Sequence, residues 1–298
     1  MFTEFNAKAQ GESHKENDTP CQDAAFSGLS CKKDIGLAVV ADGHGGEKYF
    51  RSKKGADLAV KIASKVIFDF MGKHRSIFDN KTDEEREEIL KGIERKIIFE
   101  WGNAVRDDIR GNPFTESEQQ LCADKNIDTD NENDLLSIYG TTLIAALVTK
   151  SCWFAVQIGD GACVVITKDG NAAIAIPEDE RLEFGRTTSL CDADAIDNFR
   201  QDFREESILG ITVATDGVSD SFIPEKYLEF NVNLLKDFLE SENAKQNLEN
   251  FLPVLSQRGS RDDVSIAGIF NVTEGKRFFD RKRREVPEYC SLVTGSIV

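Results

Sequence analysis

The sequence predicts an α+β fold in which antiparallel sheets are layered with helices. Several short segments rich in β-branched and aromatic residues follow one another with only brief turns between them, as antiparallel strands do. Helical patterns come in pairs between the groups of strands, whereas a parallel doubly wound sheet would alternate single helices with single strands. No internal repeat or long linker divides the 298 residues, so we predict one domain over residues 1–272 and a polar tail over 273–298.

The first part of the chain combines a buried strand with two long helices. Residues 35–41 are a continuous apolar run that stops at Asp42, which is typical of a buried strand. Apolar residues recur at every third or fourth position over residues 47–70, which predicts an amphipathic helix. Thr82, followed by acidic residues, predicts the start of a second helix that extends to about residue 109.

The second part of the chain is dominated by strands. The predicted strands span residues 141–149, 152–158, 162–167, 172–176, 208–215 and 264–270. Residues 168–171 predict the turn between the third and fourth of these, because their Asp-Gly pair tolerates positive φ. Residues 226–239 and 243–255 are predicted as a second pair of helices. The polar stretches 111–135 and 177–206 are predicted to be irregular surface segments.

The composition limits the class of protein. A formal net charge of −16 argues against nucleic acid as a partner, because phosphate backbones are bound by an excess of Lys and Arg. No apolar run of about 18 residues occurs, which argues against a membrane span. Residues 1–10 lack the pattern of a secretory signal. The seven cysteines are odd in number and widely spaced, which favours reduced thiols. We therefore expect a cytoplasmic monomer.

Several apolar runs end in, or lie next to, an aspartate beside a glycine or a second aspartate. The pairs are Asp42-Gly43, Asp160-Gly161, Asp216-Gly217 and Asp262-Asp263. A carboxylate at a strand end projects from a rigid base, and a neighbouring glycine lets backbone or water come close. Convergence of such ends would form a cage of oxygen ligands, which Mg²⁺ and Mn²⁺ prefer. A single Asp-Gly is ordinarily a turn, so this prediction depends on the recurrence of the motif.

One of these motifs makes a family resemblance specific. Asp42-Gly43-His44-Gly45-Gly46 matches the central metal motif of the type 2C (PPM) metal-dependent protein phosphatases, in a bacterial-like branch. Further motifs resemble the family's in the same order over roughly residues 11–270, namely Gln22-Asp23-Ala24, Tyr139-Gly140-Thr141-Thr142, Gly159-Asp160, Ala214 to Asp220 and Gly259 to Ser265. The resemblance implies two antiparallel sheets packed as a central sandwich flanked by pairs of helices. It also implies hydrolysis of phosphoserine or phosphothreonine in a phosphoprotein substrate.

Carried over residue by residue, the resemblance implies a site for two or three Mg²⁺ or Mn²⁺ ions that activate a water. Asp42 would bridge two ions, and the Gly43 carbonyl would bind one of them. Asp216 and Asp262 would complete one site. Asp23 would hold waters or contact the metal shell.

The remaining roles concern a weaker cation and the leaving group. Asp160 and Asp220 would help to form a third cation site, by the same resemblance. His44 would be the general acid that protonates the leaving alkoxide, which is a poor leaving group without a proton. For an isolated histidine in a loop, the simpler interpretation would be a solvated side chain.

Two departures from the family pattern affect these predictions. Gln22 stands where many members carry Glu, so the second metal would be held less tightly or through water. No Arg precedes the acidic motif at the family's phosphate-binding position; we favour His14 as its substitute, with Lys15 or a solvated loop as alternatives. A weakly catalytic module that binds phosphoproteins therefore stays open. A phosphatase of small phosphate metabolites also stays open, because substrate choice lies in loops such as residues 177–206.

Overall fold

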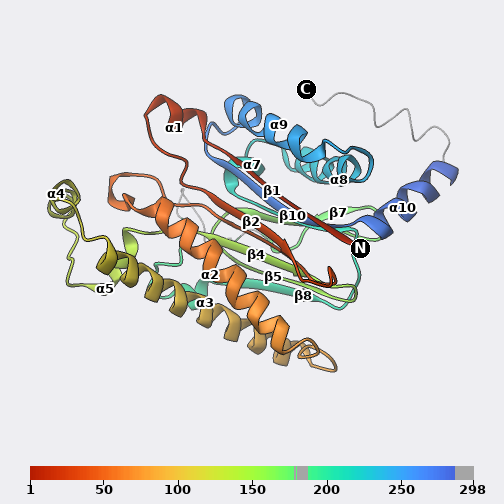
Figure 1. Cartoon of the computed structure of the whole chain (residues 1–298), viewed down its shortest axis with the longest axis horizontal. Helices are drawn as coiled ribbons and strands as arrows, with labels where there is room; N and C mark the ends of the chain where they lie inside the picture. The colour runs from red at the N-terminus through yellow and green to blue at the C-terminus, as the bar shows by residue number, and fades with distance from the viewer. Residues whose placement is uncertain (178, 180–186, 286–298) are drawn as a thin grey trace.

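Two antiparallel five-stranded sheets pack face to face, and helices cover both outer faces, in the computed structural model (Figure 1). It describes residues 1–177, 179 and 187–285. One sheet has the order β2 (Ala24–Leu29), β3 (Gly36–Ala41), β4 (Leu143–Val148), β5 (Trp153–Ile158) and β8 (Arg200–Arg204). The other has the order β1 (Phe2–Ala9), β10 (Val264–Asn271), β9 (Gly210–Ala214), β6 (Ala162–Ile166) and β7 (Ala172–Ile174). The predicted sandwich is confirmed.

The central strands are apolar throughout because both of their faces are buried. In β3, all six residues are buried. Leu37 and Val39 pack toward the helices, whereas Ala38 and Val40 belong to the apolar layer between the two sheets. A strand covered on both faces has no polar side to alternate with, so it appears in the sequence as a continuous apolar run.

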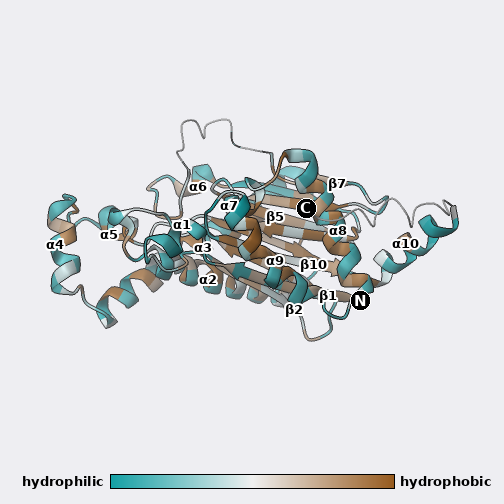
Figure 2. Cartoon of the chain, turned by 90° about the horizontal axis from the view of Figure 1, so that it is seen from above, coloured by the Kyte–Doolittle hydropathy of each residue, from teal (hydrophilic) through white to brown (hydrophobic). Residues whose placement is uncertain are grey.

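The helices are arranged in the predicted pairs. α2 (Ser52–Lys73) and α3 (Asp83–Gly111) cover the sheet that contains β3, after the short 3-10 turn η1 (Glu47–Tyr49). α8 (Pro224–Glu240) and α9 (Ala244–Arg258) cover the other sheet (Figures 1 and 2). Among the helices of the described residues, none has the length and apolar character needed to cross a membrane.

The stretch 111–135, predicted to be irregular, instead contains α4 (Glu116–Asp124) and α5 (Glu132–Ser137). The prediction missed them because polar residues form helices when their ends are capped. Thr115 and Glu118 form a capping box at the start of α4. The Asn131 side chain accepts from two backbone N–H groups at the start of α5.

Other short elements also escaped prediction. β1 and β2 carry Ala, Ser, Asn and Lys among their apolar residues, so neither resembles a buried strand in sequence. α1 (Glu12–Glu16) and α7 (Asp216–Ser219) are single turns. Within 177–206, α6 (Ala195–Asn198) and β8 are regular, and residues 178 and 180–186 lie outside the described residues.

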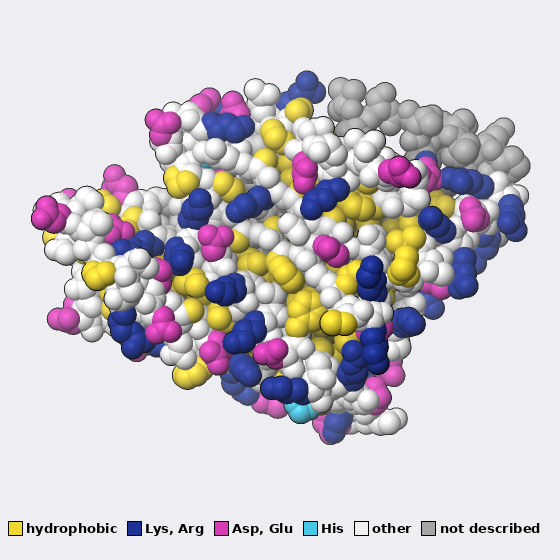
Figure 3. Space-filling view, viewed as in Figure 1, with side chains coloured by type: hydrophobic (Ala, Val, Ile, Leu, Met, Phe, Trp, Pro, Cys, Tyr) yellow, Lys and Arg dark blue, Asp and Glu magenta, His cyan; other side chains and the backbone are white. Residues whose placement is uncertain are grey.

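The segment predicted as a polar tail contains helix α10 (Val272–Glu285). Phe278 and Phe279 are buried against the outer face of the β1–β10 sheet, and this apolar contact holds the helix on the domain. Its exposed face carries Lys and Arg, which gather at one end of the molecule in Figure 3. Residues 286–298 lie outside the described residues, so the predicted boundary at residue 272 stays a prediction.

Glu94 is a carboxyl group buried in the hydrophobic layer between α3 and its neighbours. It is 1% exposed, and its Oε1 atom has no hydrogen-bond partner among the residues that the structure describes. Burial raises the pKa of Glu94 to about 8, although the charges of Lys91 and Arg95 oppose this shift. The folded state therefore keeps a proton on Glu94 that the unfolded chain loses above about pH 4.5.

This difference makes stability fall as pH rises from about 4.5 to 8. Each pKa unit corresponds to about 1.4 kcal/mol, so the expected loss between pH 5 and 8 is on the order of 2–4 kcal/mol. Glu94→Gln should remove that loss and stabilise the protein progressively above pH 5 in urea unfolding. Glu88→Gln, on the exposed side of α3, is the matched control and should keep the wild-type slope. A Glu94→Gln curve parallel to the wild type would contradict the prediction.

Candidate metal centre

Antiparallel pairing brings the predicted acidic residues to one edge of the sandwich. In such a sheet, one strand ends where its neighbour begins. Asp23 directly precedes β2 and Asp42 directly follows β3, which pair end to start. Asp262 lies just before β10 and Asp216 just after β9, which pair in the same way in the other sheet. Asp160 lies in the short connection where the chain crosses from β5 in one sheet to β6 in the other.

A hydrogen bond joins the two halves of this cluster across the sandwich. Thr215, at the end of β9, donates from Oγ1 to Asp23 Oδ2 at 2.8 Å. The same hydroxyl accepts from the Ser265 backbone N–H at 3.1 Å, which fixes it to β10. All three residues are buried. The relative position of the carboxyl groups therefore depends on the packing of one sheet against the other.

Residues 139–142 hold the backbone of the Asp42 loop in place through hydrogen bonds. The Asp42 carbonyl accepts from Thr142 N at 2.8 Å and from Thr141 Oγ1 at 2.7 Å. The His44 N–H donates to the Gly140 carbonyl at 3.0 Å. Gly43 is required by space, because a Cβ there would lie 2.8 Å from the backbone of Gln22 and of Ser52. The motif is thus held through its backbone, which leaves its side chains directed toward the cluster.

The electrostatics of the cluster are those of crowded carboxylates. Burial, and then the charge of Asp23, raises the pKa of Asp42 well above its usual range. The charge of Asp216 adds to this shift, so the two carboxyl groups act on each other. Burial and the charge of Asp160 raise the pKa of Asp216 to about 6, and burial with the charge of Asp263 raises that of Asp23 to about 8.

The remaining predicted residues lie at the same edge. The charges of Asp262 and Asp220 both act on Asp216, and the side chain of Asp262 is half exposed. Asp220 ends the short helix α7, one turn after Asp216. All six predicted aspartates therefore lie at the same edge of the sandwich, namely Asp23, Asp42, Asp160, Asp216, Asp220 and Asp262.

The donor atoms fit a hard divalent cation. Within the described ranges, no three acidic, histidine or cysteine side chains surround one point as a bound ion requires, so an ion would have to draw the oxygens together. Two buried oxygens beside the cluster, Asp23 Oδ1 and Gln22 Oε1, have no hydrogen-bond partner in the described part of the chain. Buried oxygens without donors are costly unless a cation or water satisfies them. Carboxylate and amide oxygens are the ligands that Mg²⁺ and Mn²⁺ prefer.

Asp263 is a functional neighbour whose role the sequence did not reveal. Its carboxylate accepts from the backbone N–H groups of Gly11 and Gln22, each at 2.6 Å. His14 Nδ1 lies 2.9 Å from Asp263 Oδ2, without the alignment of a hydrogen bond, and His14 Nε2 lies 3.8 Å from Asp262 Oδ1. These partners are more than 240 residues away in sequence, so no local signal could have identified them.

His44 lies beside the cluster with limited exposure to solvent. Burial lowers the pKa of its imidazole to about 4, and the charge of Asp160 opposes the shift. Its ring packs edge to face on Tyr49 at 5.1 Å between centroids. Gln22 Nε2 donates to the His44 carbonyl at 3.3 Å and to Ser52 Oγ at 2.6 Å. The amide at this position therefore supports the histidine loop.

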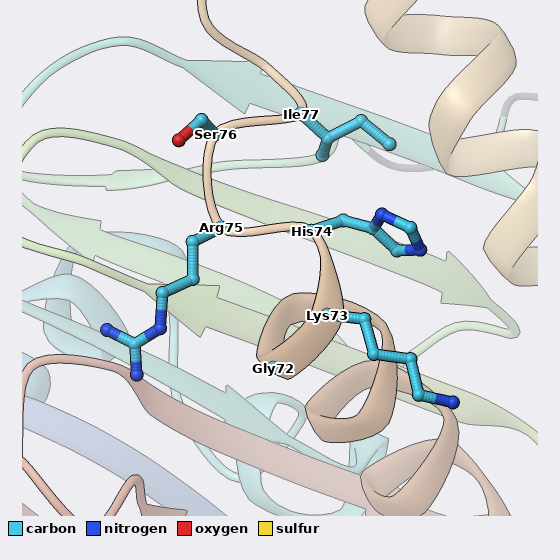
Figure 4. A pocket seen from close by; sticks show the side chains of 6 residues that line it. All are labelled: Gly72, Lys73, His74, Arg75, Ser76 and Ile77. Carbon is cyan, nitrogen blue, oxygen red and sulfur yellow. The ribbon is translucent and has the colours of Figure 1, made fainter.

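A surface hollow elsewhere carries no comparable chemistry. Figure 4 shows it at the C-terminal end of α2, lined by residues 72–77. The side chains of Lys73, His74 and Arg75 point in different directions there, and Arg75 pairs with Asp34 at 2.7 Å. None of the six aspartates lines this hollow. The acidic edge of the sandwich is the better candidate for the active site.

A comparison with models of protein families identifies the family of this chain. Residues 10–253 match the model described as "Protein phosphatase 2C", which is more than half of the chain. The chain belongs to the protein phosphatase 2C family. It is accordingly a metal-dependent protein serine/threonine phosphatase, a hydrolase whose cofactor is Mn²⁺ or Mg²⁺. The family, activity and cofactor predicted from the sequence are confirmed.

Solved structures of bacterial phosphatases share the fold of this protein phosphatase 2C family member. The serine/threonine phosphatase of S. agalactiae is 13% identical with a TM-score of 0.55, and the match covers 91% of this chain and 99% of that one. The catalytic domain of PstP, in complex with two manganese ions, is 16% identical with a TM-score of 0.54, covering 90% and 97%. PppA of Pseudomonas aeruginosa is 13% identical with a TM-score of 0.52, covering 90% and 97%. No curated protein sequence matches the chain.

Cation binding at the acidic edge can be measured without catalysis. Mn²⁺ should raise the Tm of the wild type in a concentration-dependent way, and 100 Kd of ligand would correspond to about 2.7 kcal/mol. Asp42→Asn should abolish most of this shift, because it removes a charge from the centre of the cluster. Asp107→Asn, exposed on α3, is the matched control. An unchanged Mn²⁺ shift in Asp42→Asn would contradict the site.

Proposed function

We propose that this phosphatase hydrolyses phosphoserine and phosphothreonine in protein substrates at the acidic edge of the sandwich. The observation that carries the proposal is the convergence of the six aspartates from both sheets. Divalent cations bound there would draw the phosphoryl oxygens to an otherwise negative surface and lower the pKa of a water. An acidic cluster would repel a phosphate ester without such cations.

The aspartates have distinct proposed roles that follow from their positions. Asp42 lies between the two halves of the cluster, since Asp23 and Asp216 both act on it, and is proposed as the bridging ligand with the Gly43 carbonyl beside it. Asp216 and Asp262 are proposed to complete that centre. Asp23, with its partnerless buried oxygen, would orient waters around the cations.

Asp160 and Asp220 occupy the rim, where we propose the weaker third cation. The charge of each acts on Asp216, and Asp160 also acts on His44. Asp160 follows β5 by two residues, and Asp220 ends the single turn of helix α7 that follows β9. Both residues are exposed, which suits an ion that exchanges more readily with solvent.

His44 is proposed to assist departure of the serine or threonine oxygen. Its lowered pKa keeps the imidazole neutral at pH 7, and a neutral imidazole still has one N–H to donate. As negative charge develops on the leaving oxygen, this N–H can donate a hydrogen bond to it, and the ring can pass on the proton if its second nitrogen takes up a proton from solvent. The backbone bond to Gly140 holds the ring at the cluster.

The other predictions remain proposals with varied support. His14 stays a candidate phosphate-binding group, since its Nε2 lies beside Asp262 at the rim. The six described cysteines are free thiols, which accords with the proposed cytoplasmic location. A monomer is proposed from the sequence alone.

Asp216→Asn should lower Mn²⁺-dependent hydrolysis of a phosphopeptide by at least about a hundredfold, because it removes the charge of a metal ligand. Mutation of a residue that only supports a ligand typically lowers activity about 10–100-fold, so loss of a ligand should lower it more. EDTA should abolish the wild-type rate. Circular dichroism should show an intact fold, and Asp107→Asn should keep wild-type activity. A near-normal rate for Asp216→Asn would refute its role. Absence of any EDTA-sensitive turnover would favour a phosphoprotein-binding module instead.

His44→Ala should affect alkyl phosphates far more than aryl phosphates, because an aryl oxide leaves without a proton. The loss expected for a phosphoserine peptide is roughly 10²–10⁴-fold in kcat. The rate with p-nitrophenyl phosphate should fall much less. Equal losses on the two esters would remove His44 from this role.

A further inference from the structure

Arg51, at the N-cap of α2, has partners for all five of its guanidinium N–H donors. Nε and Nη2 donate to the two carboxylate oxygens of Glu118 at 2.7 and 2.9 Å. Nη1 donates to Tyr139 Oη at 2.8 Å and to the Asn112 carbonyl at 2.9 Å. Nη2 also donates to the Pro113 carbonyl at 3.4 Å. A planar guanidinium satisfied in this way is fixed in orientation as well as in position.

The surroundings of Arg51 reinforce this fixation. Its side chain is 11% exposed, and its guanidinium lies over the Phe114 ring at 4.6 Å and near the Tyr139 ring at 5.9 Å. The hydrogen bonds from Arg51 are the main reason that the pKa of Glu118 is lowered to about 2. Arg51 thus joins α4 and the segment that precedes it to the start of α2. It is remote in sequence from both of these partners.

The partner that matters for catalysis is Tyr139. Its ring is fully buried, and its hydroxyl donates to Asp108 Oδ2 at 2.8 Å while it accepts from Arg51. The next residue, Gly140, accepts the His44 N–H at 3.0 Å. A Cβ at Gly140 would lie 2.6 Å from His44 Cδ2, so the imidazole is in direct contact with this backbone. A displacement of Tyr139 and Gly140 would therefore move the His44 ring.

Arg51 also closes the loop that carries His44. This loop, residues 44–51, is bonded at its start by His44 N to Gly140 O and at its end by Arg51 N to Ile138 O at 3.2 Å. Between these two anchors, residues 45–48 are exposed. An exposed loop of this kind keeps one conformation only if its ends are held. Both of its anchors are on the segment that the Arg51 side chain fixes through Tyr139.

We propose that Arg51 is a positioning residue for phosphoester hydrolysis, acting through Tyr139 and Gly140 to hold His44 against the carboxylate cluster. This inference rests on the proposed role of His44 in leaving-group departure. Arg51 itself contacts neither the cluster nor the reacting atoms, since its donors are all used by Glu118, Tyr139 and the 112–113 backbone. It differs from a purely structural residue because its loss should change the leaving-group dependence of the rate.

The first experiment compares Arg51→Met with the wild type on a phosphoserine peptide and on p-nitrophenyl phosphate, both with Mn²⁺. We expect kcat on the peptide to fall roughly 10–100-fold, as for a catalytic group displaced by about 1 Å, with KM nearly unchanged. The rate on the aryl ester should fall by less than about threefold. Arg75→Met, which removes a surface pair with Asp34, is the matched control and should leave both rates unchanged. Equal losses on the two esters would overturn the positioning role.

A double-mutant cycle with His44→Ala separates this inference from the proposed function. In the His44→Ala background, Arg51→Met should cost little more on the peptide, because the group that it positions is already gone. The full additional loss in that background would overturn the inference while leaving His44 as the acid. Equal losses on both esters in His44→Ala alone would overturn the role of His44, and the inference with it.

Arg51→Lys and Tyr139→Phe guard against a variant that fails to fold. Arg51→Lys keeps the charge but loses the bidentate pair, so it should lie between the wild type and Arg51→Met. Tyr139→Phe removes only the hydroxyl that joins Arg51 to Asp108. It should reproduce the selective loss on the peptide at a milder level. Wild-type selectivity between the esters in both variants would contradict the proposal.

Discussion

The acidic edge of the sandwich exists because a hydrogen bond and the packing of two sheets force carboxyl groups together against their mutual repulsion. Thr215 donates a hydrogen bond to Asp23 across the sheets, and the charges of Asp23 and Asp216 both act on the Asp42 carboxyl group. In a chain with a net charge of −16, this arrangement raises carboxyl pKa values and gives nothing to stability by itself. It becomes favourable where divalent cations neutralise it. The stability that the apolar layers supply therefore offsets the repulsion within a site that can bind cations.

Because the site is divided between two sheets, its geometry depends on the packing of three apolar layers. One sheet supplies Asp23 and Asp42, the other supplies Asp216 and Asp262, and Asp160 lies on the crossover. The layer between the sheets fixes their relative position, and the helical layers cover the outer faces. A slip of one sheet would separate the carboxyl groups even if every strand stayed intact. Packing far from the site is therefore part of the site's geometry.

The sequence predicts those features that depend on local pattern and misses those that depend on distant partners. β3 and α2 follow from an apolar run and a helical period, and Thr82 was identified as a cap because capping chemistry is local. β1 was missed because its residues resemble a strand only once β10 lies beside it. Asp42, Asp160, Asp216 and Asp262 were found as strand-end motifs, whereas Asp23 and Asp220 were found only through the family resemblance. The hydrogen bonds that the Asp263 carboxylate accepts were not predicted, because its partners Gly11 and Gln22 come from the opposite end of the chain.

The carboxylates and His44 are held in place by different kinds of contact. The carboxylates hold their positions through sheet pairing, which is distributed over many bonds and resists single changes. His44 is held by the short segment 138–140, whose far side rests on Arg51 and Glu118 of the α4 region, and by Gln22, which donates to its carbonyl. Because α4 lies on the surface and contacts η1, a change there reaches His44 through few bonds. The position of the His44 imidazole therefore depends on the contacts of the α4 segment, whereas the cation site depends on the pairing and packing of the sheets.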